Sequence, residues 1–278
     1  MASMRDIKRR KDSIQSTGQI TKAMKLVSTV KLQKAKGRAE NTKPYFDLMY
    51  ETVQSILAKS GHINHKYLKE SESDKKAVIV VTANRGLAGG YNSNITRMII
   101  DEGFTKENTV VYAVGKKGRE LLERKGYEIK ADYSEAINDP IYKDAKEICD
   151  DVLSAFADGE VGEIYLAYTV FKNTVVHEPQ LIRLLPVEAD DAAHETDGSE
   201  ALMTYEPSEE EALDMIIPKY VCSLVYGALI ESVASENGAR MQAMDSATSN
   251  AEEMISTLSL KYNSCLLYTS PSPRDMRR

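Results

Sequence analysis

The longest helical pattern in this sequence, at residues 213–262, constrains the fold more than any other feature. Apolar or small residues recur there in an unbroken alternation of three and four positions, as in a coiled-coil seam. A second apolar stripe accompanies the first up to Ala228, whereas a single seam remains beyond Met241. At 1.5 Å per residue the helix would be roughly 75 Å long, whereas a compact body of about 140 residues is roughly 40 Å across. We therefore expect the helix to protrude and to pack on a partner helix.

The natural partner is a second predicted helix, which runs from Met4 to about Leu57. Its apolar stripe is sparse, because Ser and Thr residues are interspersed with it, and Pro44 predicts a kink or a register break. Two narrow seams of this kind favour an antiparallel coiled coil of the N- and C-terminal helices. The predicted N-terminal seam consists of Ile7, Ile14, Ile20, Met24, Val27 and Val30.

Between the two helices the pattern predicts a linker at residues 60–76 and an α/β domain at residues 77–208. Short β-branched runs at 77–81, 110–114 and 164–170 alternate with helical segments that include 95–101 and 140–156, and residues 181–187 look extended. Such alternation is typical of a Rossmann-like layered domain with a mostly parallel sheet. The N-terminal helix is then assigned to residues 1–59 and the C-terminal helix to residues 209–263.

The net charge of −6 conceals two oppositely charged segments. Residues 1–38 contain eleven Lys and Arg against two Asp, while residues 188–214 contain eleven Asp and Glu and no Lys or Arg. Solvated surfaces would explain both, but the basic helix also suits an acidic protein partner. Nucleic-acid binding is disfavoured, because no aromatic interleaving or recognition motif accompanies the charges. The three cysteines show no spacing typical of a zinc site or a disulfide framework.

A glycine-rich loop follows the first predicted strand, at residues 86–90. It resembles a phosphate-binding loop only superficially, since Tyr91 and Asn92 stand where a P-loop has Lys and Ser or Thr. A GxGxxG fingerprint is also missing, and the four histidines show no ligand spacing. We therefore expect no cofactor, no metal and no intrinsic catalytic activity.

Six segments, in this order along the chain, resemble the γ subunit of bacterial-type F1Fo ATP synthase. Individually each motif is weak, but six in register over residues 4–263 form a specific match. The segments are TGQITKAMKLV at 17–27, RGLAGGYN at 85–92, YTVFKNTVVHEP at 168–179, LLP at 184–186, YEP at 205–207 and SENGARMQAMDSATSN at 235–250.

The resemblance implies a central rotor stalk threaded through a hexamer of α and β subunits. It further implies that the α/β domain sits on a ring of c subunits beside the ε subunit, and that rotation couples proton flow to ATP synthesis on β. Such a chain would lie peripherally at the cytoplasmic face of the bacterial cell membrane and reach the membrane only through the c ring. The subunit-interface residues that the resemblance implies are Lys22, Met24, Lys25, Arg85, Gly86, Leu87, Tyr205, Glu206, Arg240 and Met241.

Residues 264–278 depart from the family pattern, and the prolines Pro271 and Pro273 cannot extend a helix. We therefore expect a truncated family sequence that continues into a foreign tail. Two other classes of protein remain open at this point. A free-standing coiled-coil scaffold would explain the helices but not the inserted domain, and an α/β nucleotide-binding enzyme would explain the domain but not the protruding helices.

Overall fold

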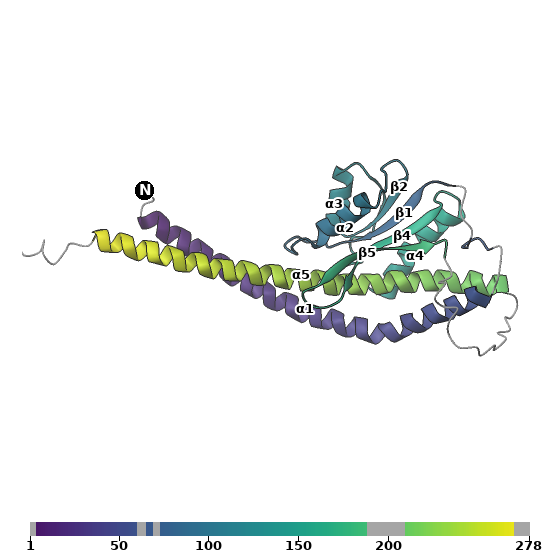
Figure 1. Cartoon of the computed structure of the whole chain (residues 1–278), viewed down its shortest axis with the longest axis horizontal. Helices are drawn as coiled ribbons and strands as arrows, with labels where there is room; N and C mark the ends of the chain where they lie inside the picture. The colour runs from purple at the N-terminus through teal and green to yellow at the C-terminus, as the bar shows by residue number, and fades with distance from the viewer. Residues whose placement is uncertain (1–3, 60–64, 69–72, 188–208, 270–278) are drawn as a thin grey trace, which may run out of the picture.

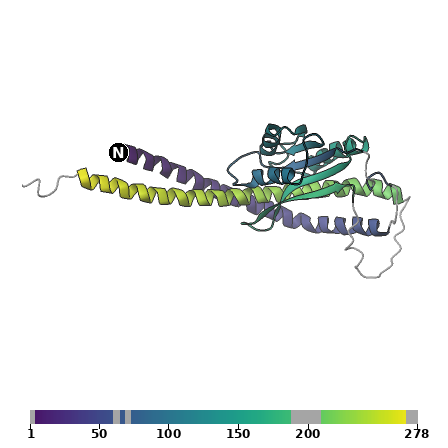
Figure 2. The ribbon, with the colours of Figure 1, turned by 45° about the horizontal axis from the view of Figure 1, so that its top comes forward.

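The computed structural model describes residues 4–59, 65–68, 73–187 and 209–269, which form a long antiparallel coiled coil with one α/β domain on its side (Figure 1). The coiled coil consists of α1 (Met4–Lys59) and α5 (Glu209–Thr269). The α/β domain covers only one half of it, and the other half projects freely (Figures 1 and 2). We call residues 4–27 of α1 with residues 244–269 of α5 the free coil, and residues 28–59 with 209–243 the embedded coil. The predicted fold class is confirmed.

The α/β domain is built on a five-stranded sheet of order β3-β2-β1-β4-β5. Its strands are β1 (Lys76–Val81), β2 (Thr109–Val114), β3 (Glu128–Asp132), β4 (Glu163–Phe171) and β5 (His177–Leu185). The first four strands are parallel and β5 pairs antiparallel with β4, so the sheet is mostly parallel as predicted. β3 is not among the predicted strands, because it is an edge strand of alternating exposure whose charged residues hide its β pattern.

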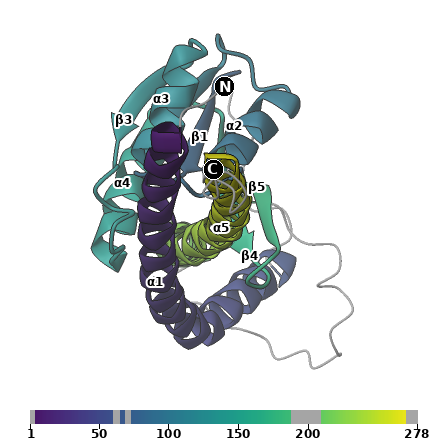
Figure 3. The same cartoon turned by 90° about the vertical axis from the view of Figure 1, so that its left-hand side faces the viewer.

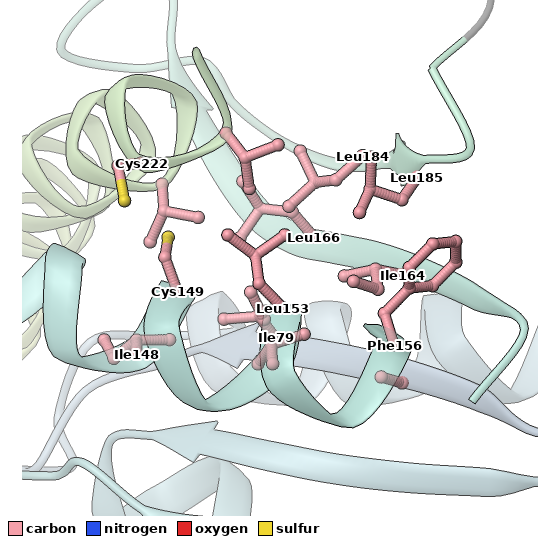
Figure 4. Close-up of a cluster of buried hydrophobic side chains, with 14 of the residues drawn as sticks. Ile79, Ile148, Cys149, Leu153, Phe156, Ile164, Leu166, Leu184, Leu185 and Cys222 are labelled. Carbon is pink, nitrogen blue, oxygen red and sulfur yellow. The ribbon is translucent and has the colours of Figure 1, made fainter. Parts of the chain in front are cut away.

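Helices cover both faces of the sheet, which is why β1 and β2 are almost entirely buried. One face packs against α2 (Tyr91–Asp101) and α3 (Lys116–Arg124). The other face packs against α4 (Tyr142–Ala157) and against α5 itself, and Figure 4 shows Ile79 of β1 and Leu166 of β4 in this cluster. The coil is therefore not merely attached to the domain, because α5 supplies part of its hydrophobic core.

The predicted seam of α5 is confirmed, since each of its positions from Leu213 to Tyr262 is buried or half-buried. The predicted seam of α1 is correct at Ile7 and Ile14, Met24 is half-buried beside the seam, and the prediction is wrong at Ile20, Val27 and Val30, which are exposed. The actual seam of α1 follows a regular spacing of three and four and continues past Pro44 without a break. It consists of Met4, Ile7, Lys11, Ile14, Gly18, Thr21, Lys25, Ser28, Leu32, Ala35, Ala39, Thr42, Phe46, Met49, Val53 and Ile56.

Small side chains occupy several positions of the α1 seam in place of the predicted apolar residues. They allow the two helices to approach closely. A Cβ atom at Gly18 would lie 3.3 Å from Cβ of Ala251, and the hydroxyl oxygens of Thr21 and Thr248 are 2.8 Å apart. Viewed along its axis, α1 curves around α5 (Figure 3). A seam formed by small and polar residues cannot be recognised from the spacing of large apolar residues.

α5 extends past the predicted boundary at Asn263 and ends at Thr269. One window within residues 210–267 has a mean hydropathy of 1.5 and is apolar enough to cross a membrane by length and composition alone. In this structure 56% of that window is buried inside the protein. The hydropathy of α5 is therefore explained by its packing against α1 and the sheet.

Candidate functional site

The C-terminal edge of the parallel strands, where open α/β sheets commonly bind ligands, is filled by the chain's own side chains. Oγ1 of Thr82 accepts the backbone N–H of Gly118 at 2.9 Å, and Oδ1 of Asn84 accepts that of Lys116 at 2.9 Å. A Cβ at Gly115 would lie 2.1 Å from the carbonyl oxygen of Thr82, so the loop and the strand are in close contact. These bonds use the N–H groups at the start of α3 that would otherwise be available to a phosphate.

The glycine-rich loop is held against α5 by Arg240. Nη2 of Arg240 lies 2.6 Å from the Glu236 carboxylate and donates to the carbonyl oxygens of Arg85 and Gly86 at 3.5 and 3.4 Å. The two ionic side chains are only 11% and 14% exposed. Leu87 has a positive φ of 64° and is 63% exposed, so the docked loop presents a large apolar side chain outward. The structure thus brings together two predicted interface segments, 85–87 and Arg240.

Three buried hydroxyl groups fix β4 and the start of α2 to the same part of α5. The Tyr91 hydroxyl donates to the carbonyl of Ser232, and burial raises the pKa of that phenol well above its ordinary value. Ser232 Oγ accepts the N–H of Thr169, and Ser235 Oγ donates to the Thr169 carbonyl. The sequence analysis did not select these residues, because Ser at a helix position is usually assigned to a solvated surface. Two sequence signals bear on this role. Ser232 and Ser235 lie next to small residues of the α5 seam, and Tyr91, Thr169 and Ser235 belong to three of the matched motif segments.

In the free coil, Lys22, Met24 and Lys25 occupy different environments. Lys22 is exposed, Met24 is half-buried, and Nζ of Lys25 forms an ion pair of 2.5 Å with Asp245. The exposed apolar residues of the predicted seam lie on the outer surface of α1 together with Leu26, and none of them belongs to a buried core cluster of the described residues. These outward residues are Ile20, Leu26 and Val27 in the free coil and Val30 at the start of the embedded coil.

Of the remaining predicted interface residues, one is packed inside the coil and two lie outside the described residues. Met241 is half-buried and packs against Leu32, Ala35 and Ala234, so it belongs to the interior of the coil. Tyr205 and Glu206 lie outside the described residues. Within the described part of the chain, no group of His, Cys, Asp and Glu side chains is arranged to hold a metal ion.

Comparison with known protein families matches residues 3–265 to a family described as ATP synthase. A relative named ATP synthase gamma chain, from Lachnoclostridium phytofermentans, is 68% identical over 269 residues, which is 95% of this chain and 92% of the relative. A second relative, from Acetobacterium woodii, is named ATP synthase gamma chain, sodium ion specific. It is 41% identical and the match covers 94% of this chain and 92% of the relative.

Solved structures show the same arrangement. A chain from the central stalk and c ring of the Tetrahymena thermophila mitochondrial ATP synthase has a TM-score of 0.62 and 26% identity, with 82% of this chain and 99% of that chain covered. A rotor chain of the Euglena gracilis mitochondrial ATP synthase matches in fold with a TM-score of 0.70 at 17% identity, over 95% of this chain and 98% of that chain. The chain therefore belongs to the ATP synthase gamma-chain family, as a non-catalytic central-stalk component of that membrane-associated rotary enzyme.

Proposed function

We propose that the free coil is the shaft that turns inside a hexamer of α and β subunits and couples proton flow through a c ring to ATP synthesis on β. The α/β domain would rest on the c ring beside an ε subunit, at the cytoplasmic face of the cell membrane. The relatives and solved structures named above support this assembly. The observation that carries it in this chain is the free coil, a slender projection whose outer surface keeps apolar side chains exposed.

The free coil is suited to turn inside a closely fitting sleeve. Its outward apolar residues give a partner a surface to pack on without fixed polar contacts. Between Ser232 and Asn263, α5 has six charged residues. Of these, Glu236 pairs with Arg240 and Asp245 pairs with Lys25, so half of them are neutralised within the chain. On the α5 side of the coil, few charges are then left to form ion pairs that would hold the shaft at one angle. The exposed Lys22 and the segment 85–87, with its exposed Leu87, are further proposed contacts with the hexamer.

The experiment compares two leucines of α1 that are equally exposed. Leu26 is 63% exposed on the free coil, and Leu48 is 64% exposed on the embedded coil. Leu26→Glu and Leu48→Glu should each leave the stability of the isolated chain within about 0.5 kcal/mol, because both side chains are already in water. In complexes reconstituted with α and β subunits, Leu26→Glu should reduce assembly or ATP-driven rotation at least tenfold, and Leu48→Glu should not.

Equal effects of the two substitutions, or failure of the unmodified chain to assemble with α and β, would contradict the proposed function. A complex that also contains the c ring tests the coupling. ATP-driven pumping measured in turn with protons and with Na⁺ as the only transportable ion identifies what the rotor moves.

A further inference from the structure

The hairpin between β4 and β5 lies on α5 where the embedded coil ends. Besides the two hydrogen bonds at Thr169, its contact with the helix is made by an aromatic pair near the turn. Phe171 and His177 are partners across the two strands, and their ring centroids are 5.9 Å apart with 34° between the planes. Phe171 also packs against the Leu32, Ala35 and Ala234 cluster of the coil.

His177 lies directly against the backbone of α5 at Gly238. A Cβ atom at Gly238 would be 2.6 Å from Cε1 and 3.1 Å from Nε2 of His177, closer than packed atoms approach. Any other residue at position 238 would therefore displace the imidazole ring. Glycine is normally unfavourable inside a helix. Its presence at position 238 is explained by the space that the His177 ring needs against the helix backbone.

Both nitrogens of the His177 ring are buried, and neither has a hydrogen-bond partner among the described residues. The half-buried ring is accommodated more easily as neutral imidazole, because protonation would place a cation there that is opposed by burial and favoured only weakly by the main chain at Thr174. Burial accordingly lowers the pKa of His177, and the main chain at Thr174 opposes this more weakly. The docked hairpin therefore favours the neutral ring.

The charged groups around His177 do not offset this preference. On the hairpin, Lys172 and Glu178 form an ion pair of 2.5 Å, and on α5 the charges of Glu236 and Arg240 are paired. Glu231 of α5 lies by the backbone of Phe171, and its own burial raises the pKa of its carboxyl, with Lys43 of α1 acting in the opposite sense. From the α2 side the facing titratable group is Tyr91, which is neutral.

We propose that the β4–β5 hairpin is a pH-sensitive latch on the coil, docked while His177 is neutral and released when His177 is protonated. The lowered pKa fixes the direction of the effect. Above the ordinary histidine pKa of about 6.5, protonation of His177 does not affect docking of the hairpin. As the pH falls from there through the lowered pKa of His177, docking weakens. Release would uncover Ser232, Ser235 and Gly238 of α5. The latch is a property of the chain itself and does not depend on the proposed partners.

His65 differs from His177 in the partners of its ring. His65 is 5% exposed, but its Nδ1 accepts the N–H of Tyr67 at 3.3 Å and its Nε2 lies 3.2 Å from Asp214. Both nitrogens thus have partners in the structure, in contrast to those of His177.

The test is amide hydrogen exchange of the full chain between pH 8 and pH 5, corrected for the intrinsic exchange rate. In the unmodified chain, there should be a pH range in which His177 is protonated in the open hairpin but still neutral in the docked one. Within that range, protection of residues 169–180 should fall by about tenfold for each unit by which the pH is lowered. His177→Leu should remove this pH dependence. Gly238→Ala should open the hairpin at every pH, and adding His177→Ala to it should restore docking.

Equal pH dependence in His177→Leu and the unmodified chain would overturn the latch, as would full protection in Gly238→Ala. An NMR titration of the histidine Cε1–H signals gives an independent answer if His177→Leu does not dock. The signal missing from that variant belongs to His177. A midpoint below about 6.5 supports the proposal, and a midpoint at or above that value overturns it.

Discussion

The embedded coil and the free coil use the same two helices but are stabilised differently. In the embedded coil, α5 is surrounded by α1, α4 and the sheet, and Leu213, Ile217 and Leu229 are completely buried. In the free coil, α1 is the only helix or strand among the described residues that packs along α5, and the seam there is only partly buried beyond Ala251. A single helix can therefore be a core element over one half of its length and a slender projection over the other, depending on how many apolar stripes its sequence carries.

The apolar residues of the two halves of the coil also differ in whether they contribute to the stability of the isolated chain. Apolar residues in the embedded coil are buried within the chain, so they contribute to its folding. Apolar residues on the outside of the free coil are left exposed by the fold, and we propose that they contact another molecule. Substitutions should accordingly act on the stability of the isolated chain in one half and on assembly in the other.

The largest expected contrast is between two leucines of α5. Leu229→Ala, in the embedded coil, should lower the free energy of unfolding by about 2–5 kcal/mol, because it leaves a cavity in a fully packed core. Leu258→Ala, at a half-buried seam position of the free coil, should cost about 1 kcal/mol or less, since water already reaches the site. Urea unfolding followed by circular dichroism measures both. Equal losses would show that the free coil is as tightly packed as the core.

Two glycines of α1 make the next contrast. Gly18→Leu should destabilise the coil by about 1–3 kcal/mol, because even a Cβ there would touch Ala251. At Gly37 a Cβ would meet no atom within 4 Å, so Gly37→Ala should instead stabilise the helix by about 0.5–1 kcal/mol. Thermal unfolding of the two variants decides the signs. A neutral Gly18→Leu would mean that the free coil tolerates a wider spacing of its helices.

The smallest expected effect concerns the ion pair of Lys25 and Asp245, whose side chains are 37% and 56% exposed. A double-mutant cycle with Lys25→Met and Asp245→Asn should give a coupling of about 0.2–1 kcal/mol. It should shrink further in 1 M salt, which screens exposed charges. A coupling that is larger and independent of salt would indicate that this part of the free coil is less open to solvent than the structure shows.

Much of the architecture could be read from the sequence because its periodicity is strong. The seam of α5 and the order of strands and helices follow from local spacing, which depends on few residues at a time. The edge strand β3 and the α1 seam could not be read in the same way. Charged residues mask β3, and the α1 seam between Gly18 and Ala35 is held mostly by small or polar side chains whose burial depends on what stands opposite.

The same distinction between sequence and tertiary structure applies to the candidate site residues. The sequence motifs selected Arg85, Gly86 and Arg240 as separate segments, and only the tertiary structure placed the Arg240 guanidinium on the loop carbonyls. Likewise, nothing in the local pattern distinguishes His177 from His65.

The sequence by itself determined that two long helices pair, that an α/β domain lies between them, and that the chain resembles a rotor subunit. These properties follow from hydrophobic periodicity and from motifs in register, which need no knowledge of distant contacts. Tertiary structure alone decided which side chains face inward along α1, which groups of the described residues are left without partners, and why glycine suits position 238. The physical reason is that burial and close approach are properties of pairs of segments, and residues 177 and 238 meet only after the sheet has packed on the coil.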